Sequence, residues 1–240
     1  MKEHLEYTIK MIDEAVLQTE PYPFLEIEDI FDNSFYADMI RYKPQGLKHF
    51  RPLSKMYSDR YVLELGYGEN VEKNMRTVNF SDLSQKTFWK EFQNTFIKNR
   101  DLAEAFVRKY KDYLDTNRTD RGKINCRISR DLKGYSIGVH RDKRDKVFSA
   151  LFYIPDTPME DRKVNWGTQI LVPNRQMVHT DSHHAYKPDG THDSFDLYKA
   201  VTFEPNKMFS WCVTKDSYHG VAPTVFDGYR DSIAFFMKQK

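Results

Sequence analysis

The sequence contains little cysteine, since Cys126 and Cys212 are the two cysteines among 240 residues. Two cysteines cannot form the disulfide framework that supports small secreted domains. A chain of this length with 40% hydrophobic residues is instead able to bury a sizeable core. A reducing compartment such as the cytoplasm is therefore the expected location.

Long hydrophobic runs are also missing. No apolar run approaches the roughly 20 residues that a membrane-spanning helix requires. The N-terminal segment from Met1 to Val16 has acidic residues throughout and lacks the apolar stretch of a signal peptide. We therefore expect no membrane partner.

The chain has little excess charge of either sign. It carries 37 basic and 35 acidic residues, which gives a formal net charge of +2. A near-neutral balance is not typical of proteins that bind nucleic acids, so a nucleic-acid partner is not expected. Aromatic residues, in contrast, are plentiful: 17 Phe, 15 Tyr and 3 Trp. Aromatic side chains fit pleated, half-buried surfaces, and their number favours a sheet-rich interior.

The first 120 residues have the pattern of a helical support region. Apolar residues recur at helical spacing over residues 2–19, and a short alternating strand follows over residues 24–29. A helix is predicted over residues 34–41. Helical spacing returns over residues 81–114, with a break expected near residues 99–101 that divides the segment into two helices.

The second half changes to short strands separated by turn signals. The predicted strands cover residues 124–128, 135–139, 147–154, 168–172, 198–203, 208–213 and 232–237. Such a series after a helical half predicts an α+β chain that is mainly β, with a compact antiparallel β barrel or jelly roll over residues 121–240 backed by the helices. We expect residues 1–240 to form a single domain.

One long irregular stretch interrupts the strands, from residue 174 to residue 196. It is rich in His, Asp, Pro and Gly. Loops of more than about 15 residues in compact domains are usually functional or disordered. Two hypotheses remain open for this segment. It forms a lid over a site, or it is a surface loop whose histidines bind nothing.

Three residues of the second half have the composition of a metal site. His140 and Asp142 continue a strand pattern, and alternate residues of a strand point to the same face. His219 comes much later, near the start of another strand, and a jelly roll brings distant strands together. Two imidazoles and one carboxylate suit a non-haem Fe(II) site with open positions. The chain offers a rival for the first two ligands, His179 and Asp181, which repeat the same spacing. We favour His140 and Asp142 because a strong strand pattern surrounds them.

A further motif, Arg230-Asp-Ser232, follows His219 and leads into an apolar strand. A guanidinium binds a carboxylate through two parallel hydrogen bonds, and Ser232 lies on the same strand face. The order His-x-Asp, His, Arg-x-Ser resembles the Fe(II)/2-oxoglutarate-dependent dioxygenases. Further segments resemble their prolyl-hydroxylase-like branch: Pro23-Phe-Leu-Glu-Ile-Glu-Asp, Phe152-Tyr-Ile-Pro155, Trp166-Gly-Thr-Gln169, Pro205-Asn-Lys-Met-Phe-Ser-Trp211 and Ser217-Tyr-His219-Gly-Val221. The segment 174–196 and the turn before His219 match no subfamily pattern.

The resemblance implies a fold, a ligand set and a reaction. The fold would be a jelly-roll (double-stranded β-helix, cupin-like) core over residues 121–240, backed by the N-terminal helices. His140, Asp142 and His219 would be catalytic Fe(II) ligands, and Arg230, Ser232 and Tyr153 would hold 2-oxoglutarate. Fe(II), 2-oxoglutarate and O2 would then hydroxylate an unactivated C–H bond and release succinate and CO2.

The substrate class is left open by the motifs. A small molecule is the first hypothesis, and the same chemistry on a protein side chain or an alkylated base is the second. A non-enzymatic β-barrel binding module is the third. Five residues around the predicted site are candidates for substrate contact: Tyr135, Arg141, Lys146, Trp166 and Trp211. Neither the oligomeric state nor the substrate follows from the sequence.

Overall fold

The computed structural model describes residues 1–54, 57–67, 80, 82–114, 122–155, 166–175, 187, 191–225 and 228–239. Within these residues, a seven-stranded sheet has the order β1-β9-β6-β11-β4-β3-β2, and a four-stranded sheet has the order β5-β10-β7-β8. The strands of the large sheet are β1 (Phe24–Ile27), β2 (Arg51–Ser54), β3 (Tyr57–Tyr67), β4 (Lys123–Asp131), β6 (Lys146–Tyr153), β9 (Lys207–Cys212) and β11 (Arg230–Lys238). Those of the small sheet are β5 (Ile137–His140), β7 (Gln169–Pro173), β8 (Phe195–Ala200) and β10 (His219–Val221).

The strands from β4 onward follow jelly-roll topology. The chain passes repeatedly between the two sheets, with β4, β6, β9 and β11 in the large sheet and β5, β7, β8 and β10 in the small one; β7 and β8, which follow each other, pair within the small sheet. The pairings within both sheets are antiparallel. This arrangement confirms the predicted mainly β, α+β fold with a jelly-roll core.

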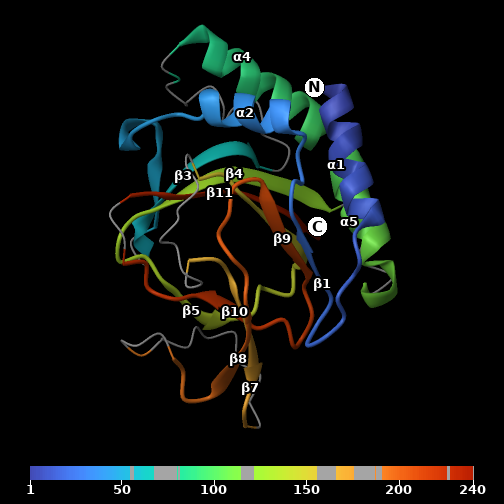
Figure 1. Cartoon of the computed structure of the whole chain (residues 1–240), viewed down its shortest axis with the longest axis vertical. Coiled ribbons are helices and arrows are strands. Elements are labelled where there is room, and N and C mark those ends of the chain that lie inside the picture. The colour runs from blue at the N-terminus through green and yellow to red at the C-terminus, as the bar shows by residue number, and fades with distance from the viewer. Residues whose placement is uncertain are drawn as a thin grey trace.

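Helices cover one face of the large sheet, as Figure 1 shows, and the small sheet lies on its opposite side. They are α1 (Lys2–Glu14), α2 (Asn33–Arg41), α4 (Leu83–Phe92), a π-helical turn (Gln93–Lys98) and α5 (Asp101–Lys109). Their apolar sides join a core rich in stacked aromatic rings; the Phe31 and Phe152 centroids, for example, are 5.1 Å apart. The main hydrophobic core therefore lies between the helices and the sheet.

The helix boundaries follow local signals. Asp32 precedes α2 and accepts a hydrogen bond of 3.0 Å from the Phe35 backbone N–H, and Asp82 caps α4 in the same way at 2.8 Å from Gln85. Arg100 adopts a left-handed conformation with φ 66° between the π-helical turn and α5. The predicted break near residues 99–101 is thereby confirmed.

Some elements differ from the sequence pattern. Strands β2 and β3 were not predicted, because charged residues such as Arg60 and Glu64 interrupt the apolar alternation of β3. Helix α1 ends at Glu14 rather than near residue 19, and β8 begins at Phe195 rather than at residue 198. Most of the stretch 174–196, including His179 and Asp181, lies outside the described residues. Among the described helices, none has the length and apolar character needed to cross a bilayer.

Candidate active site

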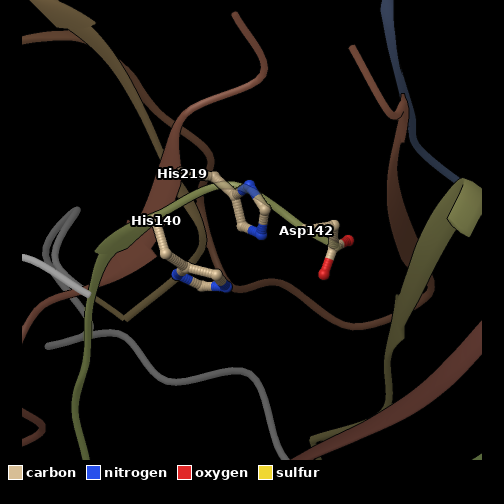
Figure 2. A group of neighbouring side chains, drawn as sticks. All are labelled: His140, Asp142 and His219. Carbon is tan, nitrogen blue, oxygen red and sulfur yellow. The ribbon is translucent and has the colours of Figure 1, made fainter. Parts of the chain in front are cut away.

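Three predicted ligand residues meet at one point between the sheets. His140 ends β5 and His219 begins β10, and the two histidines are direct partners in the antiparallel register. Their ring centroids lie 4.4 Å apart. Asp142 lies just beyond the end of β5 rather than within the strand, yet its carboxylate reaches the same point (Figure 2). One ligand atom from each of the three residues lies within 4.8 Å of the other two.

Backbone carbonyls orient both imidazoles. Nδ1 of His140 lies 2.8 Å from the Gly138 carbonyl oxygen, and Nδ1 of His219 lies 2.9 Å from the Ser217 carbonyl oxygen. A carbonyl oxygen only accepts hydrogen bonds, so each Nδ1 donates its hydrogen, and in the neutral form of each ring Nε2 carries the lone pair. This arrangement is typical of metal-binding histidines.

The Asp142 carboxylate is held by two donors. Lys146 Nζ donates to Oδ1 at 2.5 Å and Ser149 Oγ donates to Oδ2 at 2.7 Å. Burial by itself would raise the pKa of Asp142, but the nearby charge of Lys146, followed by those of His219 and His140, holds this pKa well below its ordinary value. The site therefore presents an ionised carboxylate and two imidazoles that are able to bind a metal in their neutral form. This donor set suits Fe(II) or another divalent ion.

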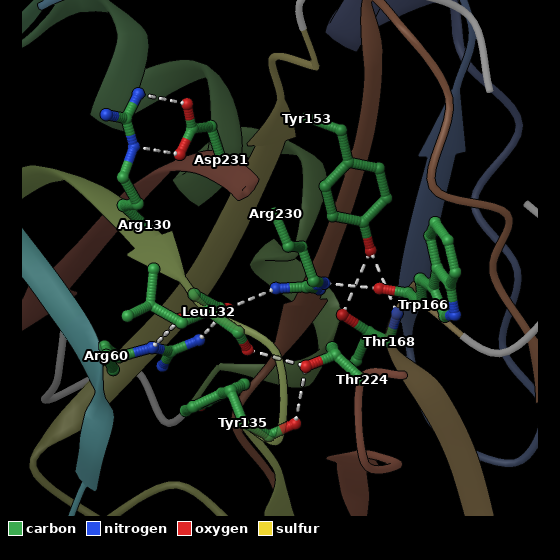
Figure 3. Close-up of polar contacts among 11 residues, drawn as sticks. Arg60, Arg130, Leu132, Tyr135, Tyr153, Trp166, Thr168, Thr224, Arg230 and Asp231 are labelled. Carbon is green, nitrogen blue, oxygen red and sulfur yellow. Dashed lines mark hydrogen bonds and ion pairs between the residues drawn. The ribbon is translucent and has the colours of Figure 1, made fainter. Parts of the chain in front are cut away.

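A cavity of about 130 Å³ joins this point to Arg230. Arg230 begins β11 and its side chain is buried, with 1% of its surface exposed. Its Nη1 donates to Asp131 at 2.8 Å and its Nε donates to the Trp166 carbonyl oxygen (Figure 3). Its buried Nη2 has no hydrogen-bond partner among the residues that the structure describes. The guanidinium is thus fixed on two sides and keeps donors for a carboxylate from the cavity.

Ser232 and Thr168 also line the cavity, whereas Tyr153 lies directly behind Thr168. The Tyr153 hydroxyl lies 3.0 Å from Thr168 Oγ1 and accepts a hydrogen bond of 3.1 Å from the Thr168 backbone N–H (Figure 3). Burial raises the pKa of Tyr153, so the hydroxyl stays protonated. The predicted contact of Tyr153 with 2-oxoglutarate stays a prediction, and Thr168 is a cavity residue that the sequence reasoning missed.

Of the five candidate substrate-contact residues, two line the cavity and three have other contacts. Trp166 is one of the three, and its carbonyl oxygen accepts a hydrogen bond from Arg230. Lys146 and Trp211 line the cavity, and the Trp211 ring centroid lies 4.3 Å from that of His219. Arg141 turns away and donates to the Lys215 carbonyl oxygen at 2.9 Å. Tyr135 stacks beneath Arg60, with 4.2 Å between the guanidinium carbon and the ring centroid.

Two arginines of the cavity wall were not predicted from the sequence. Arg60 on β3 and Arg127 on β4 both face the cavity. Arg60 pairs with Asp131 on β4 and Arg127 pairs with Ala234 on β11, both far away in the sequence, so local patterns do not reveal which face the two arginines occupy. Asp131, which pairs with Arg60 and Arg230, was missed for the same reason.

The comparisons with known proteins agree with this fold. No protein-family model matches the sequence, and no curated protein matches it. Among solved structures, a prolyl-4-hydroxylase from Pseudomonas putida is 10% identical, covers 97% of this chain and 99% of its own, and has a TM-score of 0.52. HygX from Streptomyces hygroscopicus, solved with nickel, 2-oxoglutarate and hygromycin B, is 11% identical, with coverage of 100% and 88% and a TM-score of 0.52.

A third similar structure is the dioxygenase for auxin oxidation 1 from Arabidopsis thaliana in complex with 2-oxoglutarate. It is 14% identical, covers 97% of this chain and 88% of its own, and has a TM-score of 0.54. At these identities the likeness concerns the fold. The chain therefore has the prolyl-hydroxylase-like jelly-roll fold of the 2-oxoglutarate/Fe(II) oxygenases, as its motifs predicted.

Proposed function

We propose that this protein is an Fe(II)- and 2-oxoglutarate-dependent oxygenase that hydroxylates an unactivated C–H bond of a small molecule. The observation that carries the proposal is that Arg230 lines the same cavity as His140, Asp142 and His219 while its buried Nη2 lacks a partner. A metal triad alone fits many activities. A triad and a buried, oriented guanidinium in one cavity fit a metal-bound molecule that has a second, distal carboxylate.

The residues present fit the co-substrate at both ends. Arg230 would hold the distal carboxylate of 2-oxoglutarate, with Ser232 on the same strand face. His140, Asp142 and His219 would hold Fe(II) and leave coordination positions for the 2-oxo acid and O2. Fe(II) held by these residues would supply the activation of O2 that couples conversion of 2-oxoglutarate to succinate and CO2 with hydroxylation of the C–H bond, one oxygen atom entering succinate and the other the product alcohol.

The protein's own part in this reaction is orientation and exclusion of water. The hydrogen bonds from Lys146 and Ser149 fix both oxygens of Asp142, and the carbonyl contacts fix both imidazoles. The pairing of Arg230 with Asp131 and Trp166 fixes the opposite end of the cavity. Buried walls around these groups strengthen each electrostatic contact.

The cellular context is part of the same proposal. Cys126 and Cys212 are both buried, and no disulfide joins them. Reduced thiols of this kind agree with the cytoplasm as the expected compartment.

The test is anaerobic titration of the metal-free protein with Fe(II) and 2-oxoglutarate, followed by addition of O2. We expect a visible charge-transfer band when 2-oxoglutarate chelates the iron, and slow release of succinate even without a substrate. His140→Ala and Arg230→Ala should each remove the band, the first by loss of metal and the second by loss of 2-oxoglutarate. If the wild-type protein binds Fe(II) but shows neither band nor succinate, the proposal is wrong.

A further inference from the structure

On the face of the large sheet that lines the cavity, residues of neighbouring strands lie next to one another as register partners. Arg230, Ser232, Ala234 and Phe236 alternate along β11 and all line the cavity. On the neighbouring strand β4, Ser129 is the register partner of Ser232, and Arg127 is the partner of Ala234. Arg127 therefore lies beside a small residue, and its side chain lines the cavity.

Among the described residues, no carboxylate forms an ion pair with Arg127. Its Nε is buried and donates no hydrogen bond to any carbonyl or carboxylate oxygen within the described parts of the chain. The guanidinium contacts the Phe236 ring, with 5.9 Å between its central carbon and the ring centroid. Burial lowers the pKa of Arg127 and the neighbouring charge of Arg60 lowers it further, whereas the carboxylates of Glu64 and Asp131 offset part of this change; the guanidinium stays charged at neutral pH. A largely buried cation of this kind is costly unless an anion accompanies it.

The nearby carboxylates already have other partners. Asp131 lies between Arg60 and Arg230, with contacts of 2.6 Å and 2.8 Å. Glu64, the register partner of Arg127 on β3, forms an ion pair of 2.6 Å with Arg51.

The fourth cation of the cavity wall, Lys146, is paired with Asp142 at 2.5 Å. Arg60, Arg230 and Lys146 each form an ion pair with a carboxylate, and 2-oxoglutarate is assigned to Arg230. In the described cavity wall, Arg127 is thus the cation that forms no ion pair with a protein carboxylate.

The position of Arg127 separates it from the co-substrate. The metal ligand Asp142 is anchored by Ser149 on β6, on one side of β11, whereas Arg127 projects from β4 on the other side. Arg230 lies farther along the inner face. A molecule that spans the metal and Arg230 leaves Arg127 on the flank of the cavity, where a second molecule would lie beside the metal.

We propose that the molecule that is hydroxylated carries an acidic group, a carboxylate or a phosphate, and that Arg127 binds this group with the help of Ser129. Ser129 Oγ is buried and has no hydrogen-bond partner among the described residues, so it is able to donate to the same anion. The inference rests on the proposed function and narrows its substrate class from small molecules in general to acidic ones.

The first experiment measures anion binding without turnover. The protein is loaded with Mn(II) and saturating 2-oxoglutarate, and inorganic phosphate is titrated in by calorimetry. We expect Arg127→Gln to weaken phosphate binding by about 10- to 100-fold, as loss of a charge-assisted contact does. Arg127→Lys should recover part of the affinity. Arg108→Gln, at an exposed position on α5, is the matched control and should bind phosphate like the wild type.

The second experiment measures substrate choice with matched pairs of molecules, amino acids against their amides and sugar phosphates against the parent sugars. Acidic members should stimulate succinate release from 2-oxoglutarate in the wild type, and Arg127→Gln should raise their KM. Equal stimulation by neutral members, or phosphate affinity that Arg127→Gln leaves unchanged, overturns the inference. So does an equal loss of 2-oxoglutarate and phosphate affinity, which would assign Arg127 to the co-substrate. A wild type that binds phosphate through Arg127 but never binds 2-oxoglutarate contradicts the proposed function alone.

Discussion

Arg230 and Asp131 are cross-strand partners on β11 and β4, and their side chains form an ion pair of 2.8 Å that is almost fully buried. Asp131 also binds Arg60, at 2.6 Å and 2.8 Å from its two oxygens. One carboxylate thus serves two guanidiniums, which leaves a net positive charge at this end of the cavity. The next register pair, Arg130 and Asp231, repeats the arrangement on the opposite face of the sheet, with contacts of 2.8 Å and 2.7 Å (Figure 3).

Replacing Asp131 by Asn should test whether 2-oxoglutarate binds at the cavity face of the sheet, next to Arg230. The change leaves Arg60 and Arg230 without a buried counter-charge and should lower the free energy of unfolding by about 3 kcal/mol or more. Saturating 2-oxoglutarate should restore part of that loss, because its distal carboxylate supplies the missing charge. The measurement is the shift in melting temperature that 2-oxoglutarate produces in the Mn(II)-loaded protein.

Asp231→Asn is the matched control for this experiment. It breaks the pair with Arg130 and the contact of 2.8 Å with Lys43 on the helix-covered face. It should destabilise the protein to a similar degree, but 2-oxoglutarate should not produce a larger shift than in the wild type. Equal shifts in all three proteins would show that the co-substrate does not bind at Arg230.

Replacing Arg230 by Lys should weaken 2-oxoglutarate binding although the charge is retained. A lysine ammonium cannot contact the Trp166 carbonyl, Asp131 and an incoming carboxylate in one fixed plane. We expect the dissociation constant for 2-oxoglutarate to rise by about 100-fold, measured by calorimetry with Mn(II). Arg130→Lys should lose stability yet keep an affinity close to that of the wild type. A comparable loss of affinity in both variants would point to general unfolding instead.

The sequence alone predicted that His140, Asp142 and His219 would lie together, because its signals are local. His140 and Asp142 stand at the end of one strand pattern, and His219 stands in a distinct motif. The jelly-roll topology, once predicted, requires these strands to meet. The helix break at Arg100 was predictable for the same reason, since the polar residues that interrupt the apolar spacing are adjacent in the sequence.

The cavity wall was not predictable in this way. The roles of Arg127, Asp131 and Arg60 depend on the register between β3, β4 and β11, and a shift of one residue would turn each side chain to the other face. Charged residues on the inner face also concealed β3, because a strand that lines a polar cavity lacks the apolar alternation of an ordinary half-buried strand. The same feature that makes these residues useful in a site removes the sequence signal for their strand.

Replacing Asp142 by Asn should change both metal binding and the pH dependence of stability. Metal affinity should fall by at least about 100-fold, because an anionic ligand is lost. In the metal-free protein, Asp142 has a lowered pKa, so its ionised form stabilises the folded state above the pKa of an unfolded aspartate, about 3.9. That contribution is lost as the pH falls through the folded-state pKa.

The free energy of unfolding of the metal-free Asn variant should therefore be lower than that of the wild type by about 2 kcal/mol at pH 7. The difference should shrink progressively below about pH 4. Urea denaturation in the presence of a chelator, repeated across this pH range, measures both values. A difference that stays constant down to the lowest pH would mean that the contact with Lys146 does not stabilise the folded protein.

Tyr153 and Thr168 should act as one unit in holding the co-substrate. The Tyr153 hydroxyl contacts both the side-chain hydroxyl and the backbone N–H of Thr168, and Thr168 lines the cavity. Tyr153→Phe and Thr168→Val should each weaken 2-oxoglutarate binding by about 3- to 10-fold. Because each change removes the same hydroxyl-to-hydroxyl contact, the double variant should be little worse than either single variant. Calorimetric titration of the four proteins with 2-oxoglutarate gives the coupling directly. Additive losses would show that Tyr153 and Thr168 contact the co-substrate independently, which would assign Tyr153 the direct carboxylate contact that the sequence motif predicts.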